Sequence, residues 1–146
     1  MLIRKWQESD LERISELEKE CFSDPWNYAM LRSSFLLNNF CGLIVEKEGK
    51  IVGYVGATYI FEDGEILLVA VEKENRRKGY GENLLNSVSD CLKEKGVKNL
   101  FLEVRKSNQS AIKCYQKNGF LTVGERKRYY SDGEDAIIME KKLLKD

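Results

Sequence analysis

The most informative segment of the chain reads Arg76-Arg77-Lys78-Gly79-Tyr80-Gly81-Glu82. An apolar run, residues 66–71, precedes it, and apolar residues recur at helical spacing after it, so a strand, a glycine turn and a helix start adjoin. Glycine lacks a Cβ atom, which lets backbone N–H groups approach an anion closely, while the helix dipole and the basic side chains add positive charge. The segment therefore predicts a binding site for a pyrophosphate group.

The spacing of the glycines separates this segment from two other phosphate-binding motifs. A Walker loop has Lys and Ser/Thr after its second glycine, and a dinucleotide fingerprint has a third glycine where this chain has Leu84. Glu103 does follow Gly81 at about the 20-residue spacing of a ribose-binding acid. The missing glycine, the basic residues before the turn and the position halfway along the chain still disfavour a Rossmann-type site. A glycine turn with a solvated basic run remains the alternative for this segment alone.

The order Arg76, two residues, Gly79, one residue, Gly81 resembles the acetyl-coenzyme-A signature of the GCN5-related N-acetyltransferase (GNAT) superfamily. The resemblance extends from about Ile3 to Met139, and it is carried downstream by residues 102–105, Asn108, Ala111, Tyr115, residues 119–120 and residues 134–139. The last of these is similar to the C-terminal strand of the ribosomal-protein-alanine N-acetyltransferases, the RimI-like branch. Residues 21–26 lie where that branch has its acceptor-side loop.

The resemblance implies an α/β GNAT fold, in which helices flank a mixed, largely antiparallel central sheet and two parallel strands splay apart. Residue patterns predict strands over 2–6, 41–46, 51–61, 65–71, 97–104, 120–130 and 136–143, the last two forming a hairpin. They predict helices from Ser9 or Asp10 to the region before Pro25, over 28–37, over 81–95, and after a cap at Ser107 or Asn108. The nearly continuous apolar run at 97–104 predicts a strand covered on both faces.

Length and composition predict one domain, residues 1–146, in the cytoplasm. Lys+Arg and Asp+Glu both number 24, so no overall basic charge favours nucleic acid or a membrane as a partner. The four cysteines form no C-x-x-C pair and histidine is absent, so we expect reduced thiols and no metal site. Charged residues throughout the first twenty positions argue against a signal peptide, and no apolar run is long enough to span a bilayer.

The family resemblance implies acetyl-coenzyme A as cosubstrate. Val69 and Val71 match the splayed strand that binds the pantetheine arm through backbone groups, and Asn108 matches a residue that orients it or a nearby water. The segment 76–82 is expected to bind the pyrophosphate of this cosubstrate. A backbone N–H near Val71 is the candidate for stabilising the oxyanion.

Glu103 is the candidate general base, because it interrupts an apolar strand near the carboxyl end, where a cleft is expected. Its alternative role is a solvated carboxylate or an ion-pair partner of Arg105. Tyr115 is the candidate acid that protonates the departing thiolate, with aromatic packing as its alternative role. Cys114 is a poor candidate for a covalent intermediate, because the chain has no histidine to activate it.

Five residues are candidates for binding the acceptor, because their segments correspond to the loops that flank the acceptor in related enzymes: Asp24, Trp26, Tyr129, Tyr130 and Asp132. Packing against the sheet is the alternative for the aromatic side chains. Asn27 and Tyr28 depart from the Ser and acidic residue expected after the tryptophan, which leaves the acceptor preference open.

The leading functional hypothesis is direct transfer, in a ternary complex, of acetyl to the α-amine of a protein N-terminus. The resemblance implies the N-terminal alanine of a ribosomal protein of the S-eighteen type. A small-molecule amine, such as a polyamine or aminoglycoside, is an alternative that would need convergence of acids such as Glu62, Asp63, Glu65 and Asp132. A noncatalytic acyl-coenzyme-A-binding module is a third possibility, against which Glu103 and Tyr115 argue.

Overall fold

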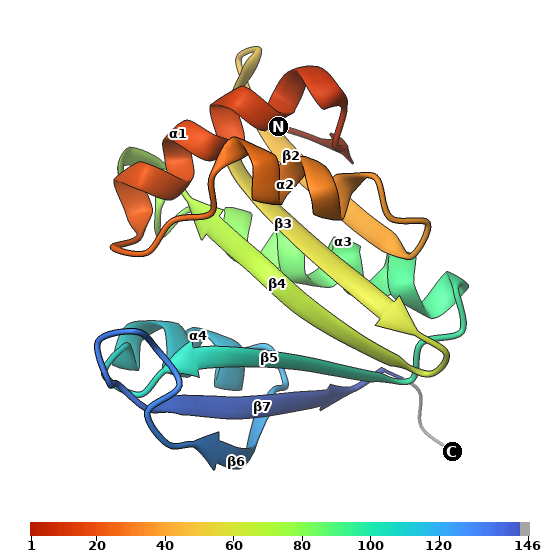
Figure 1. The fold of residues 1–146 in the computed structure, drawn as a ribbon. Helices are drawn as coiled ribbons and strands as arrows, with labels where there is room; N and C mark the ends of the chain where they lie inside the picture. The colour runs from red at the N-terminus through yellow and green to blue at the C-terminus, as the bar shows by residue number, and fades with distance from the viewer. Residues whose placement is uncertain (144–146) are drawn as a thin grey trace.

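A computed structural model describes residues 1–143 of the chain, which form a seven-stranded sheet with helices on both faces (Figure 1). The strands are β1 (Leu2–Lys5), β2 (Phe40–Lys47), β3 (Lys50–Ile60), β4 (Asp63–Val71), β5 (Asn99–Arg105), β6 (Leu121–Arg126) and β7 (Ala136–Lys142). The helices are α1 (Leu11–Cys21), α2 (Tyr28–Phe35), α3 (Tyr80–Glu94) and α4 (Gln109–Lys117), with 3-10 turns at Glu8–Asp10 and Lys73–Asn75. None of these helices is long and apolar enough to cross a bilayer.

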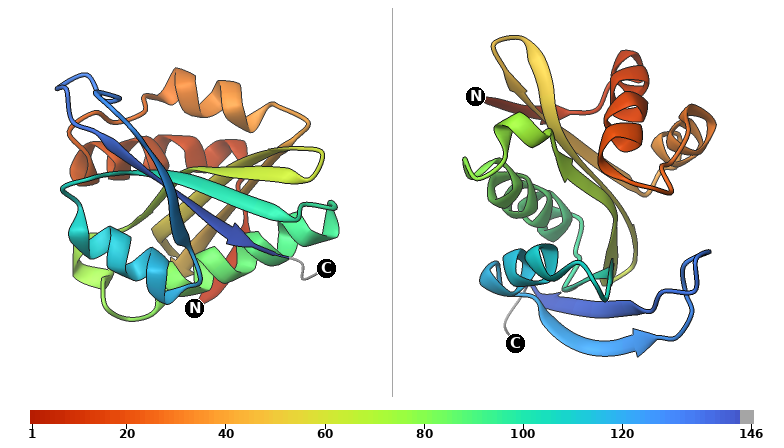
Figure 2. Two further views of the ribbon diagram at one scale, coloured as in Figure 1. Left: turned by 90° about the horizontal axis from the view of Figure 1, so that it is seen from below. Right: turned by 90° about the vertical axis from the view of Figure 1, so that its left-hand side faces the viewer.

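The strands are arranged in the order β1-β2-β3-β4-β5-β7-β6, and every neighbouring pair is antiparallel except β4 and β5. Helices α1 and α2 cover one face of the sheet, and α3 and α4 cover the other (Figure 2). Each layer has its own core, built on one side around Leu11, Ile14 and Leu31 and on the other around Leu84 and Leu92. The predicted mixed, largely antiparallel sheet is confirmed.

The two parallel strands separate partway along their length. Their pairing runs from Asp63 and Asn99 to Ile66 and Leu102, and β4 then diverges from β5 (Figure 1). A β-bulge lies at the same place, because Gly56 and Ala57 of β3 face Leu68 and Ile66, which leaves Leu67 as the extra residue. A bulge bends and twists its strand. We attribute the predicted splay, which the structure confirms, to this bulge.

One prediction about a single segment was wrong. Strand β5 is not covered on both faces: Leu100, Leu102 and Val104 are buried, whereas the alternate residues, among them Glu103, are only partly buried. The reason is that α1 and α2 pack over β2–β4 on that side of the sheet and leave β5 without a covering helix (Figure 1). Asp10, one of the two predicted caps, is the N-cap residue of α1, although its carboxylate binds the Arg4 guanidinium at 2.8 and 2.9 Å and makes no capping bond to the helix.

Most element boundaries agree with the sequence patterns to within two residues. Helix α2 ends at Phe35 rather than at residue 37, and β6 ends at Arg126 rather than at residue 130. The earlier end of β6 leaves residues 127–135 as a connection to β7. This longer loop reaches the open end of the splayed strands (Figure 2).

Candidate active site

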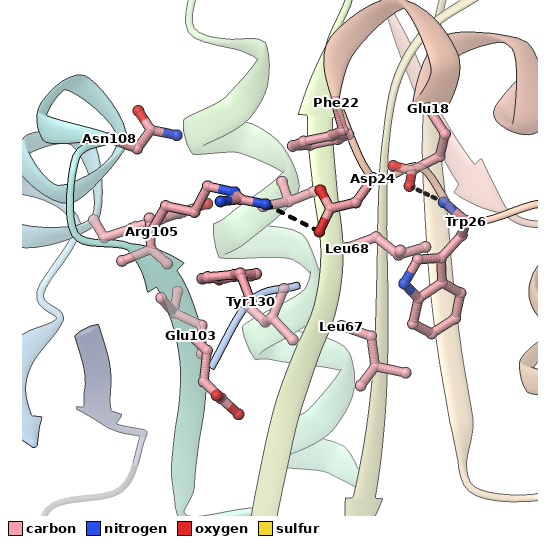
Figure 3. A pocket seen from close by; sticks show the side chains of 15 residues that line it. Glu18, Phe22, Asp24, Trp26, Leu67, Leu68, Glu103, Arg105, Asn108 and Tyr130 are labelled. Atoms are coloured by element: carbon pink, nitrogen blue, oxygen red, sulfur yellow. Dashed lines mark hydrogen bonds and ion pairs between the residues drawn. The ribbon is translucent and has the colours of Figure 1, made fainter. Parts of the chain in front are cut away.

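The splay between β4 and β5 opens a cavity of about 200 Å³ toward the carboxyl ends of the two strands. Its walls are Leu67–Val69 of β4 and Leu102–Arg105 of β5, and loops from both halves of the chain close its sides (Figure 3). The cavity brings together seven of the predicted site residues: Asp24, Trp26, Val69, Glu103, Asn108, Tyr115 and Tyr130. Of the others, Tyr129 lies beside Glu103 and Arg126, Asp132 contacts Arg105, and Val71 and the segment 76–82 lie beyond the cavity wall.

Glu103 reaches the cavity because the alternation along β5 turns it away from the core formed with α3 and α4. Its side chain is 17% exposed, and Arg126 Nε lies 3.5 Å from its Oε2 atom. That oxygen is buried and has no hydrogen-bond donor among residues 1–143. A buried carboxylate oxygen with a free lone pair is suited to accept a proton from an N–H group brought into the cavity.

Glu103 is not the partner of Arg105, which removes one of its alternative roles. Figure 3 shows its carboxylate turned away from the Arg105 guanidinium. The negative charge of Glu103 affects nearby groups. Burial is the largest cause that raises the pKa of Glu65, and the charge of Glu103 is the second. Burial and then the Glu103 charge also raise the pKa of Tyr129.

Tyr115 lies on α4, and its ring packs edge-to-face against Phe120 with the centroids 5.9 Å apart. The predicted aromatic packing is therefore present, and the residue nevertheless lines the cavity. Burial raises the pKa of the Tyr115 hydroxyl, so it stays protonated and is available as a hydrogen-bond donor at neutral pH. Its neighbour Cys114 is exposed and does not line the cavity.

Asn108 caps α4, as predicted, through a hydrogen bond that its Oδ1 atom accepts from the Ala111 N–H at 3.2 Å. The cap uses only the side-chain oxygen. Figure 3 shows the amide nitrogen turned toward the space between the strands. Asn108 can therefore cap the start of α4 and still offer two N–H donors to a group in the cavity.

The glycine turn before α3 has the properties needed to hold a pyrophosphate. Gly79 has φ +85°, a left-handed conformation that other residues adopt at a cost, and it is the N-cap of α3. A Cβ atom added at Gly81 would meet nothing closer than Val71 Cγ2 at 3.9 Å, so the turn is open on its outer side. The first N–H groups of a helix lack intrahelical partners. The residues present therefore fit an anionic diphosphate.

The basic side chains of this segment are arranged unevenly. Arg76 folds back along β4, where its Nε donates to the Val71 carbonyl at 2.9 Å. Lys78 Nζ lies 3.4 Å from Asn75 Oδ1, and the nearby Lys47 lowers the pKa of Lys78. Arg77 has a positive φ of 63°. Direct contact with phosphate by these three side chains stays a prediction.

Arg105 is a residue whose place in the site the sequence pattern did not indicate. Its guanidinium forms ion pairs with Asp24 at 3.1 Å, Asp132 at 2.8 Å and Glu134 at 3.0 Å, and lies 4.1 Å above the centre of the Tyr130 ring. These partners come from two loops that are far apart in the sequence. No local spacing could have revealed the arrangement.

Glu18 is a second residue that was missed, and here a signal existed. It lies on the apolar stripe of α1, four residues after Ile14, where a charged residue is unusual. It is buried, accepts a hydrogen bond from the Trp26 N–H at 2.9 Å, and accepts another from the Tyr54 hydroxyl. Burial raises the pKa of Glu18, although both hydrogen bonds oppose the shift. Glu18 thus fixes the loop that carries Trp26.

Residues 11–120 match the profile of the Acetyltransferase (GNAT) family. A Bacillus subtilis protein provisionally named ribosomal protein bS18-alanine N-acetyltransferase is 37% identical over 139 residues, which cover 94% of this chain and 92% of that protein. The ribosomal protein bS18-alanine N-acetyltransferase of Escherichia coli is 31% identical over 140 residues, covering 94% of each chain. The crystal structure of the ribosomal-protein-S18-alanine N-acetyltransferase from Escherichia coli has a TM-score of 0.91 at 29% identity, covering 99% of this chain and 95% of that one.

Proposed function

The chain belongs to the GNAT family of acetyltransferases, and we propose that it acetylates the α-amine of a protein N-terminus, most readily an N-terminal alanine of a ribosomal protein. The observation that carries the proposal is the carboxylate of Glu103, a residue that lines the cavity and whose buried Oε2 atom has no hydrogen-bond donor among the described residues. The names of the relatives support the choice of acceptor. The proposal includes a cytoplasmic protein and a protein substrate, and it requires neither nucleic acid nor a membrane.

The proton inventory favours an α-amine over a lysine. An α-amino group has a pKa of about 7.7–8.0 and a lysine side chain about 10.4, a difference of about 3.5 kcal/mol in the cost of removing the proton. In the proposal, Glu103 accepts that proton at its Oε2 atom, and one carboxylate is a sufficient base for the smaller task. The neutral amine then attacks the acetyl carbonyl directly, with no acetylated side chain in between.

Acetyl-coenzyme A supplies the acetyl group as a thioester. We assign its pyrophosphate to the α3 N-terminus with Gly79 and Gly81, its pantetheine arm to the backbone at Val69 and Val71, and a polar contact to the Asn108 amide. Glu82 lies in the first turn of α3, where its negative charge opposes that of the diphosphate, so the backbone N–H groups and the basic residues 76–78 must outweigh it.

Tyr115 acts in this proposal as a hydrogen-bond donor to the departing sulfur. Full proton transfer would run uphill, because a thiol has a pKa of about 8.5 and tyrosine about 10, a gap of about 2 kcal/mol. Burial raises the pKa of Tyr115 and widens the gap. The hydroxyl therefore stabilises the developing thiolate by a charge-assisted hydrogen bond, and the solvent completes its protonation.

The alternative small cationic acceptor gains little from the acids named for it. Glu62 is paired with Lys98, Asp63 accepts a hydrogen bond from Asn99, and Asp132 is bound to Arg105. Of the four acids, Glu65 is the one whose pKa is raised by the charge of Glu103, in addition to burial. These acids do not converge as a polyamine site would require.

A panel of acceptors incubated with acetyl-coenzyme A and analysed by fragment mass spectrometry tests the proposal. We expect acetyl on the α-amine of a peptide that begins with free alanine, in preference to an internal lysine of the same peptide. A matched peptide with a blocked N-terminus is the control. Dominant labelling of lysine, or activity on polyamines alone, would contradict the proposal.

A further inference from the structure

Different ion pairs lie at the two ends of the cleft between β4 and β5. At the closed end, where the strands are paired, Lys98 forms an ion pair with Glu62 at 3.4 Å. At the open end the strands have separated, and there Arg105 of β5 reaches across to Asp24 at 3.1 Å (Figure 3). The second contact joins two residues that line the same cavity as Glu103.

Arg105 is fixed firmly on its own side of the cleft. Its partner Glu134 also accepts a hydrogen bond from the Ser107 N–H at 2.8 Å, and its partner Asp132 accepts one from the Glu134 N–H at 3.0 Å. The Tyr130 ring lies beneath the guanidinium, which leaves the Arg105 side chain only 20% exposed. The guanidinium is therefore already oriented before it meets Asp24.

Asp24 is held much more loosely. Its side chain is 46% exposed, and Arg105 is its ion-pair partner among the described residues. The loop that carries Asp24 is anchored at its other end, because the Trp26 N–H donates to the buried Glu18 carboxylate. The contact between Asp24 and Arg105 thus fixes the position, relative to β5, of the part of this loop that Glu18 does not hold.

We propose that Arg105 is a positioning residue for the acceptor. Arg105 joins the loop of Asp24 and Trp26 to the loop of Tyr130, and these loops lie on either side of Glu103. This inference rests on the proposed function. Asp24 is nearly half exposed, and an ion pair to such a carboxylate contributes little to stability, so this contact acts on loop position rather than on folding. The guanidinium is shared by three carboxylates, which leaves the entrance negatively charged and suited to a cationic N-terminus.

Steady-state kinetics with an alanine-terminated peptide provide the first test. We expect Arg105→Gln to raise the acceptor KM about tenfold and Asp24→Asn about threefold, with kcat changed less than KM, because acceptor positioning is lost while Glu103 is intact. Because the two residues act through one contact, the double variant should be little worse than Arg105→Gln alone. Arg105→Lys should restore part of the affinity. The control, Lys98→Gln, breaks the ion pair at the closed end and should leave the acceptor KM unchanged.

Hydrogen exchange of the protein without any acceptor separates this inference from the proposed function. Arg105→Gln and Asp24→Asn should both speed amide exchange in residues 22–27, and Lys98→Gln should not. If these peptides exchange at the parent rate in both variants, the inference is wrong whatever the acceptor is. It is also wrong if coenzyme affinity, measured by calorimetry, falls as much as acceptor affinity. Faster exchange in an enzyme that rejects every N-terminal peptide would uphold the loop coupling and overturn the proposed acceptor.

Discussion

Glu103 has an ion-pair partner in Arg126 but a buried oxygen that receives no hydrogen bond within residues 1–143. If this oxygen removes the acceptor's proton, Glu103→Gln should lower kcat/KM by about 10²-fold near neutral pH, the usual scale of a general base. The loss should shrink as pH rises, because an α-amine with a pKa of about 7.7–8.0 is increasingly neutral without help. Rates across pH 6–9 measure this. A defect of constant size at every pH would remove Glu103 from the role of base.

Tyr115 tests the other half of the reaction. Because burial keeps its hydroxyl protonated, we expect Tyr115→Phe to lower kcat by about tenfold, the loss of one charge-assisted hydrogen bond, without loss of coenzyme affinity. Cys114→Ala is the matched control on the same helix, since Cys114 is exposed and outside the cavity. A dead Cys114→Ala variant, together with an acetylated parent enzyme trapped by mass spectrometry, would overturn direct transfer.

The start of α3, with its glycine turn, is where we propose that the pyrophosphate of the coenzyme binds. Gly81→Val should weaken the binding of acetyl-coenzyme A by about tenfold or more, because the side chain would occupy the approach to the first N–H groups of the helix. The fold should tolerate the change, since a Cβ atom there is 3.9 Å from its nearest neighbour. Calorimetry measures the affinity. Gly124→Val in β6, where an added Cβ has ordinary contacts, is the control, and equal affinities in both folded variants would place the pyrophosphate elsewhere.

Strands and helices differ in how much of them the sequence could predict. The glycine turn, α3 and the Asn108 cap depend on neighbouring residues, so their patterns located them well. The bulge at Leu67 depends on the register between β3 and β4, which leaves no mark in either strand alone. The one-sided exposure of β5 likewise follows from the packing of α1 and α2 over β2–β4 and not from its apolar sequence. The family resemblance supplied the splay that residue patterns could not.

For the molecule as a whole, the place of Glu103 and the glycine turn before α3 were predictable, and the ion-pair network around Arg105 was not. Glu103 is recognisable in the sequence because it is an acid within an apolar strand. Gly79 is recognisable because it is a glycine at the start of a helix. The role of Arg105 depends on its ion pairs with Asp24 and Asp132, which lie more than twenty residues before and after it in the chain. Such contacts exist only after the two halves of the sheet have come together, so spacing rules cannot indicate them.

Glu18 connects the same site to global stability, because its carboxylate is buried and its pKa is raised. A carboxyl group with a raised folded-state pKa contributes stability that is fully present below its unfolded pKa, about 4.3, and is lost as pH rises through the folded pKa. Glu18→Gln cannot ionise and keeps an acceptor for the Trp26 N–H. We therefore expect its stability relative to the parent to increase as pH is raised from 4 to 8 in urea denaturation. The exposed Glu20→Gln on the same helix should show no such trend. A parent and a Glu18→Gln variant whose stabilities run parallel across this range would mean that Glu18 stays ionised at the base of the Trp26 loop.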